Sequence, residues 1–221
     1  MRFQKWIVLS SALLIAWPSY GQRWIEYLDR TQFFGINFPG EPEVEDINYT
    51  SGTGVVFPAR VYTAPDGDSV YQVTVVDFND AERLHAERED RTSASGGEWL
   101  KDVRGSVAHA AWNFRRRGGE VTYDAWSDIE RVEGHQLQIT NEDGSRTFAG
   151  IYLHNGRLHI LDAKVPPGWP PPMHFQQSLH FFDEDGVRVR YELDINGNTT
   201  RVPGSYEYGG GRSDVIERDA D

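Results

Sequence analysis

The chain has 221 residues, with 34 acidic and 22 basic side chains, a formal net charge of −12 and no cysteine. This length suits a single domain with a real hydrophobic core, and the acidic balance makes nucleic acid and anionic lipid surfaces unexpected partners. The absence of cysteine excludes disulfides, thiolate metal sites, a cysteine nucleophile and the acylated cysteine of a lipoprotein.

The first 21 residues have the layout of a secretory signal peptide. Arg2 and Lys5 give a basic start, residues 6–17 form an apolar run, and small residues occupy the −3 and −1 positions of a cut before Gln22. The alternative is an uncleaved membrane anchor, but the apolar run is shorter than the about 20 residues that span a bilayer. We therefore expect export to the periplasm or the medium, with no stable membrane insertion after cleavage.

The predicted domain, residues 22–200, begins with strands joined by tight turns. Phe34, Ile36 and Phe38 alternate with smaller or polar residues, as in a half-buried strand. Further on, two-residue turns separate runs of strand-forming residues. These turns are Asp66-Gly67, Asp143-Gly144 and Asn155-Gly156, and the runs are 55–63, 70–78, 135–140, 147–153 and 157–163. Such spacing predicts an antiparallel meander.

Two segments have helical spacing. Residues Trp99, Val103, Val107, Ala110 and Phe114 form an apolar stripe, which predicts a long helix ended by Gly118-Gly119. Apolar residues at 175, 179 and 182 predict a shorter helix from Pro172 to the Asp185-Gly186 turn, followed by a last strand over 187–191.

Two further segments are strongly polar. Residues 79–91 are densely charged, so we expect a solvated loop or a short exposed helix there. Residues 201–221 hold few apolar side chains and are predicted to form a flexible acidic tail. The fold class that follows is α+β, an antiparallel sheet covered by one long and one short helix.

This order of elements is similar to the PsbP-like fold, which includes exported bacterial proteins of the DcrB type. The resemblance covers about residues 31–191. It depends on the segments 34–42, 118–119, 134–139, 175–179 and 185–186. It implies the fold and an accessory or binding role without enzymatic activity, and it transfers no active-site residue.

No catalytic or cofactor motif stands out, since a Gly-x-Ser-x-Gly elbow, a His-Glu-x-x-His pair and a phosphate-binding glycine loop are all missing. His154 and His159 flank one turn, but side-chain alternation would place them on opposite faces of a sheet unless a bulge intervenes. We expect both to be exposed, turn-flanking residues rather than metal ligands. The acidic segments 183–186 and 194–198 lack the full spacing of a calcium loop and are expected to be reverse turns.

Aromatic residues give the candidate interaction site. Trp112 falls opposite the apolar stripe of the long helix, near His109 and Arg116, on the face expected to be wet. Trp169 stands within the proline-rich segment 166–172, which is typical of a stiff, exposed loop. The alternatives are that Trp169 folds back over a sheet edge and that Trp112 packs against a neighbouring element.

These observations favour an exported, non-catalytic accessory protein that binds another envelope protein. Two other hypotheses stay open. One is a periplasmic hydrolase that uses carboxylates and histidines on a saccharide or peptide, and the other is a carrier with a small-ligand cavity between helix and sheet.

Overall fold

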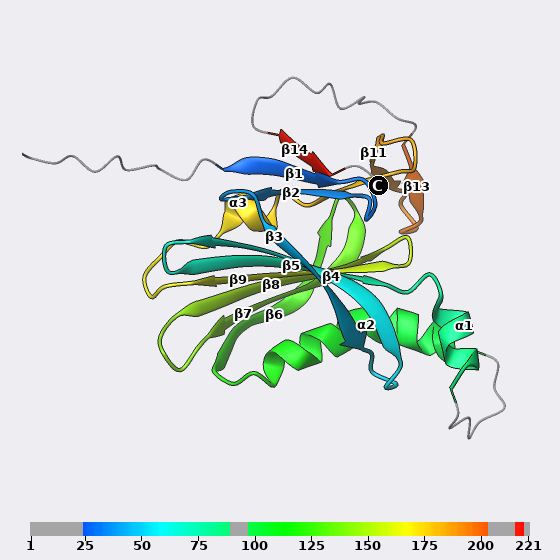
Figure 1. The fold of residues 1–221 in the computed structure, drawn as a ribbon, viewed down its shortest axis with the longest axis horizontal. Coiled ribbons are helices and arrows are strands. Elements are labelled where there is room, and N and C mark those ends of the chain that lie inside the picture. The colour runs from blue at the N-terminus through cyan, green and yellow to red at the C-terminus, as the bar shows by residue number, and fades with distance from the viewer. Residues whose placement is uncertain (1–23, 89–96, 203–214, 219–221) are drawn as a thin grey trace, which may run out of the picture.

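The computed structural model describes residues 24–88, 97–202 and 215–218, which form two packed sheets and three helices (Figure 1). The larger sheet has seven strands, all antiparallel to their neighbours. In spatial order they are β3 (Glu43–Thr50), β4 (Val56–Asp66), β5 (Ser69–Asp77), β9 (Arg157–Val165), β8 (Arg146–His154), β7 (Val132–Thr140) and β6 (Glu120–Ile129). The predicted antiparallel meander is confirmed, and the turns at 66–67, 143–144 and 155–156 join neighbouring strands.

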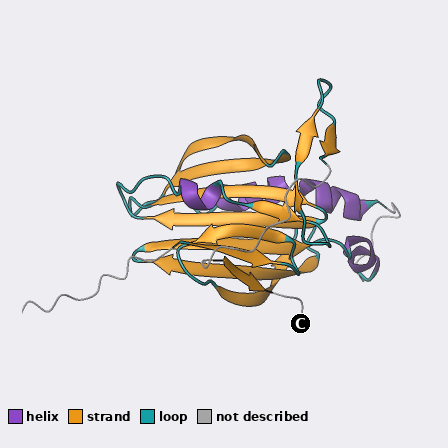
Figure 2. Cartoon of the chain, turned by 90° about the horizontal axis from the view of Figure 1, so that it is seen from above, coloured by secondary structure: helices purple, strands orange, loops and turns teal. Residues whose placement is uncertain are grey.

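The smaller sheet has five strands and covers one face of the larger sheet, while the long helix covers the other, as Figures 1 and 2 show. Its order is β11 (Arg188–Val189), β10 (His180–Phe182), β2 (Phe34–Phe38), β1 (Ile25–Asp29) and β14 (Val215–Arg218), with only the β1–β14 pair parallel. A separate hairpin pairs β12 (Tyr191–Leu193) with β13 (Thr199–Arg201). The fold is therefore α+β, as predicted.

The helix-covered face contains the predicted long helix, α2 (Glu98–Arg115). Ala110 and Phe114 are buried, and the other stripe residues pack against the same core cluster. A shorter helix, α1 (Ala81–Ala86), lies in the charged segment for which a loop or a short helix was expected. It is not wholly exposed, because His85 is buried and its Nε2 lies 3.1 Å from Asp102 Oδ2 on α2.

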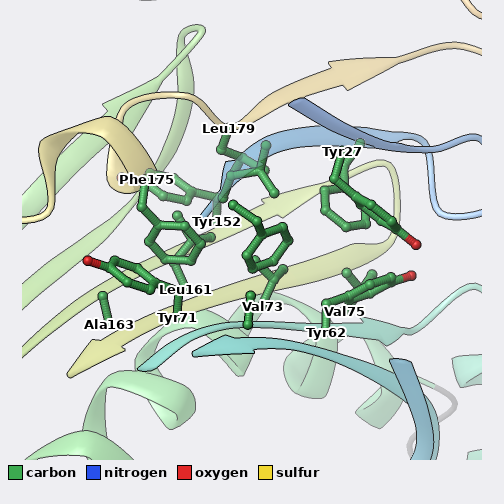
Figure 3. Close-up of a cluster of buried hydrophobic side chains, with 14 of the residues drawn as sticks. Tyr27, Tyr62, Tyr71, Val73, Val75, Tyr152, Leu161, Ala163, Phe175 and Leu179 are labelled. Atoms are coloured by element: carbon green, nitrogen blue, oxygen red, sulfur yellow. The ribbon is translucent and has the colours of Figure 1, made fainter. Parts of the chain in front are cut away.

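The sheet-covered face is lined with aromatic side chains from both sheets (Figure 3). Tyr27 and Phe34 of the small sheet each meet the ring of Tyr62 on β4 edge-on, at centroid distances of 5.7 and 5.1 Å. The Tyr62 hydroxyl donates a 2.7 Å hydrogen bond to the buried carboxylate of Asp29 at the end of β1. Large aromatic side chains of this kind supply most of the buried area of a core.

The second helix, predicted to run from Pro172 to the Asp185-Gly186 turn, is much shorter in the structure. Only α3 (Met173–Gln176) is helical, and β10 then pairs with β2 through the His180–Gly35 and Phe181–Phe34 registers. Phe181 and Phe182 are both buried. A strand with two packed faces buries consecutive residues, so the helical spacing of 175, 179 and 182 describes two separate elements.

The predicted last strand and tail also differ from the structure. Residues 187–191 are divided between β11 and β12, because the chain leaves the small sheet after Val189. Val215–Arg218 adds to the free edge of β1, although the composition predicts a flexible tail. Strand addition needs only backbone hydrogen bonds, which composition does not reveal.

The predicted signal peptide and the cleavage site before Gln22 lie outside the described residues. Of the helices in the described ranges, none is both long and apolar enough to cross a membrane.

Candidate interaction surface

The solvent face of α2 carries a row of exposed side chains that we call the α2 stripe. Each member lies three or four residues from another member, and the members therefore share one side of the helix. They are Lys101, Arg104, Ala108, Trp112, Arg115 and Arg116. The stripe is basic and aromatic on a protein whose net charge is −12.

Trp112 is the centre of this surface. Its side chain is 48% exposed, and the Arg116 guanidinium carbon lies 4.2 Å from its ring centroid. The His109 ring lies 6.0 Å away and is held in place by a 3.1 Å hydrogen bond with Asn113. The structure thus brings together the three residues that the sequence singled out on this helix, and it leaves Trp112 exposed rather than packed against a neighbouring element. Their role in binding stays a prediction.

The cations of the stripe divide into paired and unpaired groups. Arg115 donates two hydrogen bonds to Asp124 on β6, at 2.6 and 2.8 Å. Arg115, with help from His135, holds the pKa of the Asp124 carboxyl at about 2. Lys101, Arg104 and Arg116 form no ion pair with any residue in the described ranges. No carboxylate in the described part of the chain therefore neutralises these three charges.

Trp169 lies on a different surface, in the loop between β9 and α3. Its side chain is 51% exposed, so about half of its surface is open to solvent. Its backbone is fixed, because the Trp169 carbonyl accepts a hydrogen bond from Arg146 and its amide donates to the Pro166 carbonyl. An anchoring role for Trp169 stays a prediction.

The prediction for His154 and His159 is wrong in two respects. Tyr152 lies opposite His159 in the β8–β9 register, and His154 is two residues further along β8, so both histidines share the sheet-covered face. The two-residue turn makes odd positions of one strand oppose even positions of the next. Both side chains are also buried rather than exposed, at 7% and 1%.

The acidic turns use their carboxylates on their own backbone. Asp183 Oδ1 accepts from the amides of Asp185 and Val187, and Asp194 Oδ1 accepts from the amides of Asn196 and Asn198. The described ranges hold no group of three His, Asp or Glu side chains placed to bind a metal ion. The expectation of reverse turns is confirmed at both places.

Sequence reasoning missed three cations of the α2 stripe, Lys101, Arg104 and Arg115, and one partly buried arginine, Arg157. Lys101 and Arg104 could have been found, because they follow the same spacing as Trp112 on the side opposite the apolar stripe. Arg157 had no such signal, since its neighbours Phe33, before β2, and Asp77, at the end of β5, are far away in the sequence.

No family model matches the sequence, and no curated protein matches it. Among solved structures, the fold is similar to the solution structure of cyanobacterial PsbP (CyanoP) from Synechocystis sp. PCC 6803. The two share 15% sequence identity with a TM-score of 0.44, over 76% of this chain and 99% of that chain. The match falls in the family that the sequence resembles; it concerns shape alone and brings no residue, ligand or activity to this chain.

Proposed function

We propose that this protein is an exported, non-catalytic accessory protein that binds an acidic partner protein of the cell envelope through the α2 stripe. The observation that carries the proposal is the gathering, on one helix and its C-cap in an acidic protein, of an exposed tryptophan and three cations that have no ion-pair partner among the described residues. Tryptophan and arginine are the residues most enriched where binding energy concentrates in protein interfaces.

The geometry of Trp112 and Arg116 suits this role. Stacking of the guanidinium on the indole limits the freedom of both side chains before a partner arrives, which lowers the entropic cost of binding. The unpaired cations attract an acidic surface and orient it, so the partner is expected to carry carboxylates around an apolar pocket.

The alternative function, hydrolysis of a saccharide or peptide, is less well supported. Burial acts to raise the pKa of Asp183, but hydrogen bonds from Arg201 and two backbone amides outweigh it and leave the pKa below its ordinary value. A carboxylate held ionised in this way is a poor general acid. His154 is neutral near pH 7 and hydrogen-bonded to the Tyr191 hydroxyl.

Charge reversal on the stripe tests the proposed function. The tagged full chain, expressed in its own host, is compared with the double variant Arg104→Glu, Arg116→Glu and with the control Arg131→Glu, an exposed arginine on a β-turn away from α2. We expect an acidic envelope protein that the parent and the control capture and the double variant loses. Equal capture by all three chains would contradict the proposal.

Export is tested separately by mass spectrometry of the protein recovered outside the cytoplasm. We expect the mature chain to begin at Gln22, with or without cyclisation to pyroglutamate. A membrane-retained chain that still carries Met1 would contradict export.

A further inference from the structure

A cavity of about 640 Å³ lies at one end of the two sheets, where the β1–β2, β8–β9 and β10–β11 turns meet. We call it the end cavity. Small-molecule pockets usually measure about 300–1,000 Å³, so its volume suits a small ligand. Its inner part includes the buried His154 and the partly buried Arg157, and its exposed part includes Glu184 and Asp185. It lies between two sheets, not between helix and sheet as the carrier hypothesis supposed.

Arg157 has hydrogen-bonding capacity that the protein does not use. Its side chain is 17% exposed, and its guanidinium carbon lies 4.8 Å from the Phe33 ring centroid. The distance from Nη2 to Asp77 Oδ2 is 3.7 Å, too long for a hydrogen bond, and the buried Nε has no acceptor within the described residues. A guanidinium has five donors in a fork that matches a carboxylate.

The backbone at the cavity is held in an unusual conformation. Phe33 has φ +58°, in the left-handed region that side chains other than glycine, asparagine and aspartate rarely adopt. Such residues are found preferentially at ligand sites. In this conformation Phe33 lies under Arg157 and fixes the guanidinium at the cavity wall.

The other basic groups of the cavity are already neutral or paired. Burial, together with the charges of Arg157 and Arg201, lowers the pKa of His154 to about 4. Arg201 forms an ion pair with Asp183. Arg157 faces the Asp77 carboxylate of the same cavity at 3.7 Å without a hydrogen bond, so it is the inner cation with donors left over for a ligand.

The exposed part of the cavity has the opposite charge. Glu184 and Asp185 have exposed side chains that form no ion pair with any residue in the described ranges. These carboxylates repel a simple anion and attract a cation. A ligand that carries both a negative and a positive charge is complementary to both parts of the cavity.

We infer that the end cavity binds a small zwitterion, an amino acid or short peptide, with its carboxylate on Arg157 and its ammonium group near Glu184 and Asp185. The inference stands on the cavity alone and does not depend on the α2 stripe.

Three matched probes test it by NMR titration of the full chain: dialanine, N-acetyl-dialanine and dialanine amide. We expect saturable binding of dialanine with shifts at the amides of Asn155 and Glu184, and binding weaker by about tenfold or more for each analogue that lacks one charge. No saturable binding of dialanine, or equal binding of the three probes, would overturn the inference.

Two sets of variants complete the test. Arg157→Gln should weaken dialanine binding about tenfold, while Arg131→Gln, outside the cavity, should leave it unchanged. The double variant Glu184→Gln, Asp185→Asn changes only exposed groups, so its folding is secure. It should weaken dialanine and strengthen N-acetyl-dialanine. If this double variant kept the parent's preference for dialanine over N-acetyl-dialanine, the proposed orientation would be refuted, whether or not Arg157→Gln folds.

Discussion

The two faces of the seven-stranded sheet are covered in different ways. The helix-covered face is closed mainly by α2, a continuous 18-residue segment. The sheet-covered face is closed by strands from both ends of the chain, residues 25–38, 180–189 and 215–218, which must first pair with one another. The helix α2 forms from local sequence, whereas the five-stranded sheet forms only through pairing of segments that are distant in the sequence.

The two faces also differ in their buried polar groups. On the helix-covered side, His85 has a carboxylate partner in Asp102. On the sheet-covered side, His154, His159 and His180 are buried among aromatic rings, and the carboxylate nearest His180, that of Glu26, lies 3.5 Å from its Nε2. Neither ring nitrogen of His159 makes a hydrogen bond of regular geometry with a described residue. Protonation of these histidines at low pH should therefore destabilise the sheet-covered face more than the helix-covered face.

The largest expected effect comes from Gly134→Ala on β7. A Cβ atom there would lie 2.2 Å from the Ile151 carbonyl oxygen and 2.3 Å from Tyr152 Cδ1, in the sheet-covered face. Since backbone on one side and a buried ring on the other must shift, we expect a loss of about 3 kcal/mol or more in the free energy of unfolding. Urea denaturation measures it. A loss below about 1 kcal/mol would show that this face is loosely packed.

Acid provides the next test. Burial lowers the pKa of His154 and of His180 to about 4 and that of His159 to about 3, against 6.5 for an unperturbed histidine. At a pH between the lowered pKa values of the folded chain and 6.5, the unfolded chain binds more protons than the folded one. The free energy of unfolding should therefore fall as the pH is lowered from about 6.5 towards 4.

His159→Leu sharpens the acid test. It removes one buried titrating group, so proton uptake on unfolding near pH 5 should fall by about one proton. At pH 8, where histidines are neutral in both the folded and the unfolded chain, proton uptake on unfolding should be the same for parent and variant. The same proton uptake in both chains at pH 5 would mean that His159 is not buried in its neutral form.

The same contrast explains how much could be predicted. Trp99 to Phe114 repeat with a helical period, and glycine or asparagine at 67, 144 and 155–156 fixes the turns, so α2 and the meander follow from short stretches of sequence. The pairing of β10 with β2, and of β14 with β1, joins residues more than 140 positions apart, and no local pattern encodes it. Trp112, His109 and Arg116 were predictable because they share one helix. Arg157 was not, because its cavity is built from separate turns.

Gly105→Ala gives a smaller effect of the opposite sign on the helix-covered side. Apart from the helix's own backbone, no atom of a described residue lies within 4 Å of a Cβ placed at this position in α2. Alanine restricts the unfolded chain and favours the helix, so we expect a gain of about 0.5–1 kcal/mol in the free energy of unfolding. A loss of stability in thermal or urea denaturation would mean that the packing of α2 is tighter than described.

Trp169→Ala should change stability least. Half of the side chain is exposed, and the loop is held through its backbone, so we expect a change within about 0.5 kcal/mol. Thermal denaturation beside the capture assay separates the two possible roles. A loss of about 3–5 kcal/mol would instead mark a buried aromatic that covers the sheet edge.

The most direct test of the proposed function is photocrosslinking in the living cell from position 112. A photoreactive phenylalanine analogue replaces Trp112 in one chain and Tyr123 in a matched control. Tyr123 is 43% exposed on the edge strand β6 and, as the neighbour of Asp124, faces the side of the sheet away from α2. We expect one acidic envelope protein to be trapped from position 112 and not from position 123. The same products from both positions, or none from position 112, would contradict binding through the α2 stripe.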